Sequence, residues 1–182
     1  MKIIHKRTLK VLGIACIVSI QFIIFLIRKQ YAIPQKTNSK LLSIITKSLQ
    51  SSEVPKINVS DAAAHQSSYL FLDSREKEEY NVSHINNSIY VGDKEFDINK
   101  VEQFPKDTGI IVYCSVGVRS DKIAKEIIDA GYTNVNNMFG GIFEWINEGY
   151  PIFDSMGKST QNIHAYSRMW GIFVNSNHKV YD

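Results

Sequence analysis

The strongest chemical signal in the sequence is a cysteine at the start of a short loop. The loop reads Cys114-Ser115-Val116-Gly117-Val118-Arg119-Ser120, and it follows an apolar run at positions 110–113. A β-branched run that ends at a cysteine predicts a buried parallel strand with the thiol at its carboxyl end, where open α/β sheets bind ligands. Apolar side chains at helical spacing follow Ser120, so the loop leads directly into a helix.

The helix start gives this loop the chemistry of an anion site. The first N–H groups of a helix have no partner within it, and the helix dipole favours negative charge there. Gly117 lets the backbone curl so that its amides converge, and Arg119 adds a fixed positive group. A cysteine facing such a cradle is stabilised as the thiolate and is therefore a nucleophile. A lone cysteine after a strand is more often an ordinary buried residue, but the Gly and Arg spacing favours the reactive loop.

The length of the loop selects among cysteine chemistries. Only the residues from Ser115 to Val118 separate Cys114 from Arg119. Phosphatases that use a cysteine place a longer loop there, which can ring a phosphate with amides. The shorter loop suits the terminal sulfur of a persulfide better, so a phosphatase or arsenate reductase is disfavoured.

Four segments, in order along the chain, resemble the rhodanese family of sulfurtransferases. They are Asp73-Ser74-Arg75 with Glu78-Glu79-Tyr80; His84-Ile85; the cysteine loop; and Gly140-Gly141 with Trp145 and Gly149-Tyr150-Pro151-Ile152. The resemblance covers residues 55–152 and departs from the family pattern at Ser83, at Asn87-Ser88 and at Ser115. The departure at Ser115 affects which sulfur donor the site prefers, because active members of the family often carry a bulky polar residue at this position.

The resemblance implies an α/β fold of three layers, with helices on both faces of a mostly parallel central sheet. We expect strands over 56–59, 69–72, 110–113 and 134–138, and a helix from Ser60. Strands separated by helical patterns also predict βαβ units and a parallel sheet. Asp73 and Arg75 are expected to form a salt bridge or a turn at the sheet edge that carries Cys114, and Trp145 is expected in the core.

The resemblance also implies rhodanese-type thiosulfate:acceptor sulfurtransferase chemistry. The Cys114 thiolate attacks the outer sulfur of thiosulfate or of a persulfide, and the resulting Cys114 persulfide passes its sulfur to cyanide, a small thiol or a protein thiol. No cofactor is expected, and the histidines and cysteines show no metal-ligand spacing. The expected catalytic residues are Cys114 and Arg119. The expected substrate-binding residues are Ser115, Val116, Gly117, Val118 and Ser120.

Two alternatives stay open beside the sulfurtransferase. A sulfur-relay or redox module would deliver the Cys114 persulfide to a protein partner, and Ser115 favours it because this residue removes a positive contact to thiosulfate. A catalytically silent interaction domain with the rhodanese fold is the other alternative. The intact Cys114 and Arg119 argue against it.

The start of the chain contains a candidate membrane segment. Residues 11–27 carry no charge and lie between Lys10 and Arg28-Lys29. A helix over this run spans roughly 25 Å, slightly less than the hydrocarbon core, and the flanking basic side chains can snorkel. A cleaved signal peptide would suit the basic start, but the run ends without a small-residue cleavage site. We therefore expect one uncleaved transmembrane helix, a signal anchor.

The charge distribution separates this segment from the rest. The first forty residues hold eight Lys or Arg and no Asp or Glu, which leaves 13 basic against 18 acidic side chains in the remainder. The net charge of +3 thus comes from the membrane-flanking segment, and nucleic-acid binding gains no support. Basic residues lie on both sides of residues 11–27, but the position at the start of the chain favours an internal amino terminus. This predicts a single-pass membrane protein with a periplasmic or extracytoplasmic domain.

These patterns divide the chain into four parts. They are a membrane anchor (1–29), a linker with a short amphipathic helix (30–54), the rhodanese-like domain (55–153) and a C-terminal extension (154–182). The amphipathic helix is expected to pack on the domain, and the alternative is that it lies on the membrane surface. No internal repeat is visible, which predicts one rhodanese domain and not a tandem pair. Aromatic residues over 164–173 are spaced to pack on the domain, and Trp170 is expected to be buried.

Overall fold

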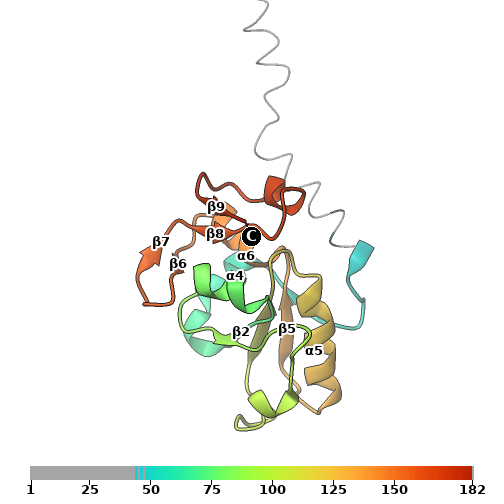
Figure 1. Ribbon diagram of the computed structural model, residues 1–182. Helices are drawn as coiled ribbons and strands as arrows, with labels where there is room; N and C mark the ends of the chain where they lie inside the picture. Colours follow the sequence, from blue (N-terminus) through green and yellow to red (C-terminus); the bar gives the residue numbers. More distant parts are fainter. Residues whose placement is uncertain (1–43, 45, 47, 182) are drawn as a thin grey trace, which may run out of the picture. The chain divides into compact units, whose positions relative to one another are not determined.

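The computed structural model describes residues 44, 46 and 48–181 (Figure 1). Its strands are β1 (Lys56–Ile57), β2 (Leu70–Asp73), β3 (Ile89–Tyr90), β4 (Ile110–Tyr113), β5 (Val135–Met138), β6 (Ile152–Phe153), β7 (Ser159–Thr160), β8 (Ile163–His164) and β9 (Lys179–Val180). Its α-helices are α3 (Val59–Ala64), α4 (Lys77–Val82), α5 (Arg119–Asp129) and α6 (Gly141–Asn147). The predicted anchor, residues 1–29, lies outside the described residues. Among the described residues, no helix is long and apolar enough to cross a membrane.

The central sheet brings the ends of β2 and β4 to one place. Its strand order is β1-β5-β4-β2-β3, and every pairing is parallel. Asp73 pairs with Tyr113, so β2 and β4 end level with each other. The chain leaves β2 through α4 toward β3 and leaves β4 through α5 toward β5, in opposite directions along the sheet. Such a reversal opens a crevice at the carboxyl ends of the strands, where ligands bind in this class of fold.

Alternate side chains of the central strands enter separate cores on the two faces of the sheet. Phe71 and Ile111 pack with α3 and α6 on one face. Leu72 and Val112 pack with the apolar side of α5 on the other face. Strands buried on both faces read as continuous apolar runs, which explains the strength of the β4 signal. The predicted α/β fold with a parallel central sheet is confirmed.

The predicted strands need small corrections at their ends. The strand predicted over 110–113 matches β4, whereas β2 and β5 each begin one residue later than predicted. The strand predicted over 56–59 ends at Ile57, because Asn58 is the N-cap of α3 and Val59 is its first residue. Val59 is buried in the core, so its apolar character serves the helix and not a strand.

The C-terminal extension shares the core of the domain. β6 pairs antiparallel with β7, and β8 pairs parallel with β9. β8 lies against α4 (Figure 1). Ile163, Ala165 and Phe173 are buried in the same cluster as α6 and the near face of the sheet. The extension is therefore packed on the domain along much of its length.

The linker differs from its expected packing. Ile44, Thr46, Ser48 and Leu49 are helical, as the pattern predicts. Thr46 is buried, whereas the side chains of Ile44 and Leu49 are exposed. The expectation that the apolar side chains of this helix pack on the domain is wrong for these two residues, because the buried position is taken by a threonine.

Candidate active site

The Cys114 thiol lies directly after β4, at the crevice between the two crossovers. Cys114 is 1% exposed, and its thiol is not part of a disulfide. The N–H of Gly117 donates to Cys114 Sγ at 3.2 Å, so the loop curls back onto its own sulfur. The Ser120 hydroxyl lies 3.6 Å from the same sulfur and makes its shorter hydrogen bond, 2.7 Å, to Oδ1 of Asn137. The sulfur thus accepts a hydrogen bond from the middle of the loop and lies near the Ser120 hydroxyl at its end.

The first turn of α6 holds the start of the loop. The N–H of Ile142 donates to the carbonyl of Cys114 at 2.9 Å, and the N–H of Phe143 donates to the carbonyl of Ser115 at 3.1 Å. These are N–H groups that a helix start cannot satisfy within itself. Gly141 precedes them with φ +59°, and any Cβ there would overlap the carbonyl oxygen of Cys114. A glycine is therefore required for this close approach.

Gly117 fixes the middle of the loop. Its φ is +89°, and an added Cβ would lie 2.7 Å from Nε2 of Gln50. Its carbonyl accepts from Nδ2 of Asn137 at 2.8 Å and from Nε2 of Gln50 at 2.9 Å. Because a planar peptide directs each N–H opposite to the preceding carbonyl, the N–H groups that follow these held carbonyls face the other way. They belong to Ser115, Val116 and Val118. Together with the Gly117 N–H, these are groups from which a backbone anion cradle can be built.

Arg119 is paired with a buried carboxylate that the sequence did not predict as its partner. Its Nη1 donates to Oε2 of Glu79 at 2.7 Å, and its Nη2 donates to Oε1 at 2.9 Å. The Ser115 hydroxyl donates to the same Oε1 at 2.7 Å, and the backbone N–H of Glu76 donates to Oε2 at 3.0 Å. The Glu79 carboxylate therefore accepts four hydrogen bonds. We call Glu79, Arg119 and Ser115 the Glu79 network.

The pKa values in this network show how the pair is ionised. Burial by itself raises the pKa of Glu79, but the hydrogen bond and charge of Arg119, with smaller effects of Arg75 and Ser115, bring it below the ordinary value. Burial by itself lowers the pKa of Arg119, and the hydrogen bond to Glu79 and the nearby negative groups raise it overall. Both partners are therefore charged at neutral pH.

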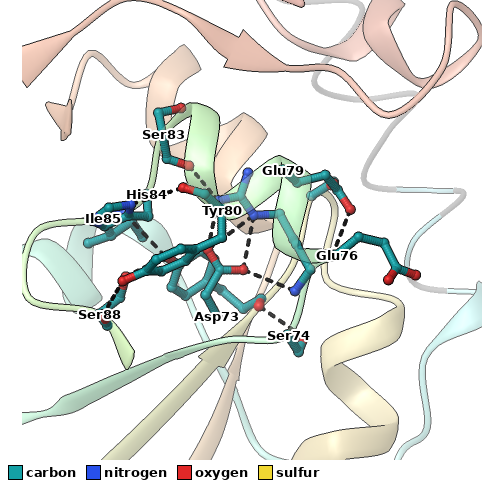
Figure 2. Close-up of polar contacts among 12 residues, drawn as sticks. Asp73, Ser74, Glu76, Glu79, Tyr80, Ser83, His84, Ile85 and Ser88 are labelled. Atoms are coloured by element: carbon teal, nitrogen blue, oxygen red, sulfur yellow. Dashed lines mark hydrogen bonds and ion pairs between the residues drawn. The ribbon is translucent and has the colours of Figure 1, made fainter. Parts of the chain in front are cut away.

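A second ion pair supports the neighbouring strand end (Figure 2). The guanidinium of Arg75 is fully buried, and its Nη2 contacts Oδ2 of Asp73 at 2.7 Å. The same Nη2 donates to the carbonyl of Ser83 at 2.6 Å, which joins the end of α4 to the end of β2. Ser74 donates from its backbone N–H and its hydroxyl to the carbonyl of Tyr113. The predicted salt bridge is confirmed, and it braces the strand ends that hold the loop.

A cavity of about 170 Å³ opens at the cysteine loop. It is lined by Cys114, Ser115, Val116, Val118, Arg119, Tyr166 and Trp170. Gly117 and Ser120, the other predicted site residues, do not line the cavity. They contact the Cys114 sulfur through the Gly117 N–H and the Ser120 hydroxyl. Trp170 packs against the core as expected, but it is only partly buried and also forms part of the cavity wall. The reason is that the short helix at Trp170–Phe173 buries Phe173 in the core and leaves Trp170 at the cavity.

Tyr166 is a site residue that sequence reasoning missed. Its φ is +62°, a conformation that side-chain-bearing residues rarely adopt. The Arg119 guanidinium carbon lies 4.9 Å from the centroid of its ring. Strained residues of this kind cluster at functional sites. In the sequence Tyr166 is one aromatic among several, and no local signal marks its backbone conformation.

The described residues contain no metal-ligand cluster. In the part of the chain at 44, 46 and 48–181, no three His, Cys, Asp or Glu side chains lie close enough together to hold a metal ion.

The cysteine loop, the β2 ion pair and the first turn of α6 all lie within the part of the chain that one family model matches. The sequence model of the rhodanese-like domain matches residues 58–148, half of the chain. The chain belongs to the rhodanese-like domain family. Within this rhodanese-like chain, the match stops before β7, so the extension that supplies Tyr166 and Trp170 lies beyond it.

Similar proteins match only parts of this chain, and the matches cover only parts of those proteins. The adenylyltransferase and sulfurtransferase uba4 of Ogataea parapolymorpha is 31% identical over 101 residues, which is 54% of this chain and 26% of that protein. A sulfurtransferase of Allochromatium vinosum is 36% identical over 53 residues, 29% of this chain and 50% of that protein. The chain thus spans about a quarter to a half of the length of these relatives.

A solved structure supports the fold. The thiosulfate sulfurtransferase of Pseudomonas aeruginosa has a TM-score of 0.54 with this chain at 18% identity. The similarity covers 75% of this chain and 26% of that one. At this identity the likeness shows the fold alone.

Proposed function

We propose that this chain is a sulfurtransferase that carries sulfane sulfur as a persulfide on Cys114. The observation that carries the proposal is the Cys114 sulfur at the cavity wall, with the Gly117 N–H 3.2 Å away. Held loop carbonyls leave the N–H groups of Ser115, Val116 and Val118 free to face an anionic sulfur. Membership of the rhodanese-like family supports the same chemistry.

The proposed transfer has two steps with balanced bonds and charges. The Cys114 thiolate attacks the outer sulfur of thiosulfate or of a persulfide; an S–S bond forms at Sγ, and the donor's S–S bond breaks with its electron pair leaving on sulfite or on a thiolate. The outer sulfur is then held as an anion by the loop amides, which stabilise charge in a low-dielectric site. A thiolate or cyanide attacks that outer sulfur, and the Cys114 thiolate is restored as the leaving group.

A sulfur relay is the second candidate. Ser115 and Arg119 are both committed to Glu79, which leaves thiosulfate with weaker binding than a free positive group would give. The donor or acceptor would then be a persulfide or thiol on a protein partner. A catalytically silent interaction domain is the remaining alternative, and the cavity beside a free thiol argues against it.

The test is intact mass spectrometry of the full chain with Cys16→Ser, so that Cys114 is the remaining thiol of the two cysteines. The protein is incubated with thiosulfate and, separately, with a small organic persulfide. We expect a gain of one sulfur, ~32 Da, that is absent from the matched Cys114→Ala protein. Labelling by either donor supports sulfur carriage. Absence of an adduct with either donor would contradict sulfur carriage and favour the catalytically silent interaction domain.

We also propose that residues 11–27 anchor the chain in a membrane, with the rhodanese-like domain on the periplasmic or extracytoplasmic side. The support is the charge-free run flanked by basic residues. The full chain should resist alkaline extraction from membranes, and Ile20→Lys should release it, because a central lysine costs about 3 kcal/mol in a membrane helix. Protease digestion of intact cells or spheroplasts should cut the domain; a protected domain would reverse the proposed orientation.

A further inference from the structure

We propose that Tyr166 and Trp170 make this site selective for organic persulfides with an apolar R group, R–S–SH, over inorganic dianions such as thiosulfate. The inference rests on the proposed function and names its substrate class. It follows from the charge balance of the cavity, from the nature of its walls and from the way the extension holds those walls.

The cavity offers a dianion no uncompensated positive charge. Among the described residues that line it, Arg119 alone carries a positive charge, and both of its Nη groups bind the Glu79 carboxylate. The nearby Arg75 is likewise paired with Asp73. A thiosulfate ion would lose its hydration shell on entering the cavity, and the cations there are already paired with carboxylates. Binding of a doubly charged ligand is therefore unfavourable.

The remaining walls suit an apolar group. Val116 and Val118 from the loop face the same cavity as Tyr166 and Trp170 from the extension. Apolar and aromatic surfaces gain free energy when they are covered by an apolar ligand. The outer sulfur of R–S–SH can then lie at the Cys114 sulfur and the loop amides while R contacts the aromatic walls.

The extension holds these two aromatic residues in place. The N–H of Tyr166 donates to Nδ1 of His164 at 3.2 Å, and the N–H of Ala165 donates to the carbonyl of Val180 at 2.9 Å. The Trp170 ring lies 5.9 Å from the ring of Phe173, which is buried in the core. A residue held in a rare backbone conformation needs such support, and here the support presents the ring to the cavity.

The transfer from such a donor balances without a further reagent. The Cys114 thiolate attacks the outer sulfur, an S–S bond forms at Sγ, and the electron pair of the donor's S–S bond leaves on R–S⁻. The proton of the outer sulfur passes to R–S⁻, so the products are the Cys114 persulfide anion and R–SH. The Cys114 sulfur is oxidised by the step, and the inner sulfur of the donor is reduced to the thiol.

The experiment compares donors by the second-order rate constant of Cys114 persulfide formation in the full Cys16→Ser chain, followed by quenched-flow mass spectrometry. The donors are benzyl persulfide, the carboxylate-bearing persulfide of 3-mercaptopropionate, and thiosulfate. We expect the rate constant of benzyl persulfide to exceed those of the other two donors, which carry an additional or a larger negative charge, by about tenfold or more, the discrimination that an apolar pocket provides.

The variants assign this preference to the walls. Tyr166→Asn removes the ring while keeping a residue that tolerates positive φ, and Trp170→Leu removes the second ring. Each should lower the benzyl persulfide rate constant about tenfold and should lower its ratio to the thiosulfate rate constant by a similar factor. Met169→Ala is the control on the same segment, because Met169 is exposed and does not line the cavity.

The outcomes separate the two proposals. Thiosulfate reacting as fast as benzyl persulfide would overturn the selectivity while sulfur carriage stands. A benzyl preference that survives both Tyr166→Asn and Trp170→Leu would overturn the assignment to these residues. Absence of any adduct with all three donors would overturn the proposed function itself.

Discussion

The guanidinium carbon of Arg119 lies 4.9 Å from the ring centroid of Tyr166 while its two Nη groups bind Glu79. One side chain therefore links α4, the start of α5 and the C-terminal extension. Arg119 is 20% exposed in its side chain, whereas Glu79 is 1% exposed, so the carboxylate depends on this partner more than the guanidinium does.

Glu79→Gln should destabilise the fold. The change removes the buried carboxylate and leaves the Arg119 charge without its partner, which costs about 3 kcal/mol at a buried pair. Chemical denaturation of the full chain measures the free energy of unfolding. Glu78→Gln is the matched control, because Glu78 is exposed on the same helix. Equal stability of the two variants would contradict the central role of the Glu79 network.

The stability contributed by Glu79 should depend on pH in the acid range. The pKa of Glu79 is lowered in the folded chain, so the unfolded chain binds its proton first as pH falls. The contribution is therefore complete above the ordinary pKa of a glutamate and is lost as pH falls through the lowered folded value. The difference in unfolding free energy between the parent and Glu79→Gln should be largest near neutral pH and should shrink on acidification. A difference that stays constant down to pH ~3, below the ordinary range of a glutamate, would argue against this ionisation.

Gly141→Ala should disrupt the cysteine loop. The added Cβ would overlap the Cys114 carbonyl oxygen and would lie 2.7 Å from the carbonyl carbon of Ser115, so the loop must move. Gly149→Ala is the matched control, because Gly149 also has positive φ but has nothing within 4 Å of an added Cβ. The control should lose about 1 kcal/mol from backbone strain alone. Gly141→Ala should lose more stability and should also slow Cys114 persulfide formation; equal effects would remove the steric argument.

Asn137→Ala should weaken the hydrogen bonds that hold the cysteine loop against β5. The Asn137 side chain donates to the carbonyl of Gly117 and to Oδ1 of Asp121, and it accepts from Ser120. Losing these buried hydrogen bonds should cost about 2 kcal/mol of unfolding free energy and slow the persulfide step. Asn136→Ala, at the partly exposed neighbouring position of β5, tests the effect of an asparagine loss alone. Identical rate constants for the two variants would show that Asn137 does not position the loop.

Much of the fold could be predicted from local patterns. The run Ile110–Tyr113 is buried on both faces, and its continuous apolar character gave the limits of β4. The β2 ion pair could also be predicted, because Asp73 and Arg75 follow a strand that ends beside β4. These features depend on residues that are close in sequence or on adjacent parallel strands.

The parts that escaped prediction depend on distant contacts. The pairing of Arg119 with Glu79 joins two helices whose spacing no sequence period reports. The strands β7 to β9 have two residues each, too short to show the alternation that marks a strand. The place of Tyr166 at the cavity depends on these short strands, so it became visible only with the packed extension.

The burial of Ile163, Ala165 and Phe173 in the main core has a practical consequence for anyone who shortens this protein. A fragment that stops where the family match stops, at residue 148, would expose apolar surface that the native chain covers and would lose two walls of the cavity. Such a fragment would be prone to aggregate, and its substrate preference would describe a different pocket.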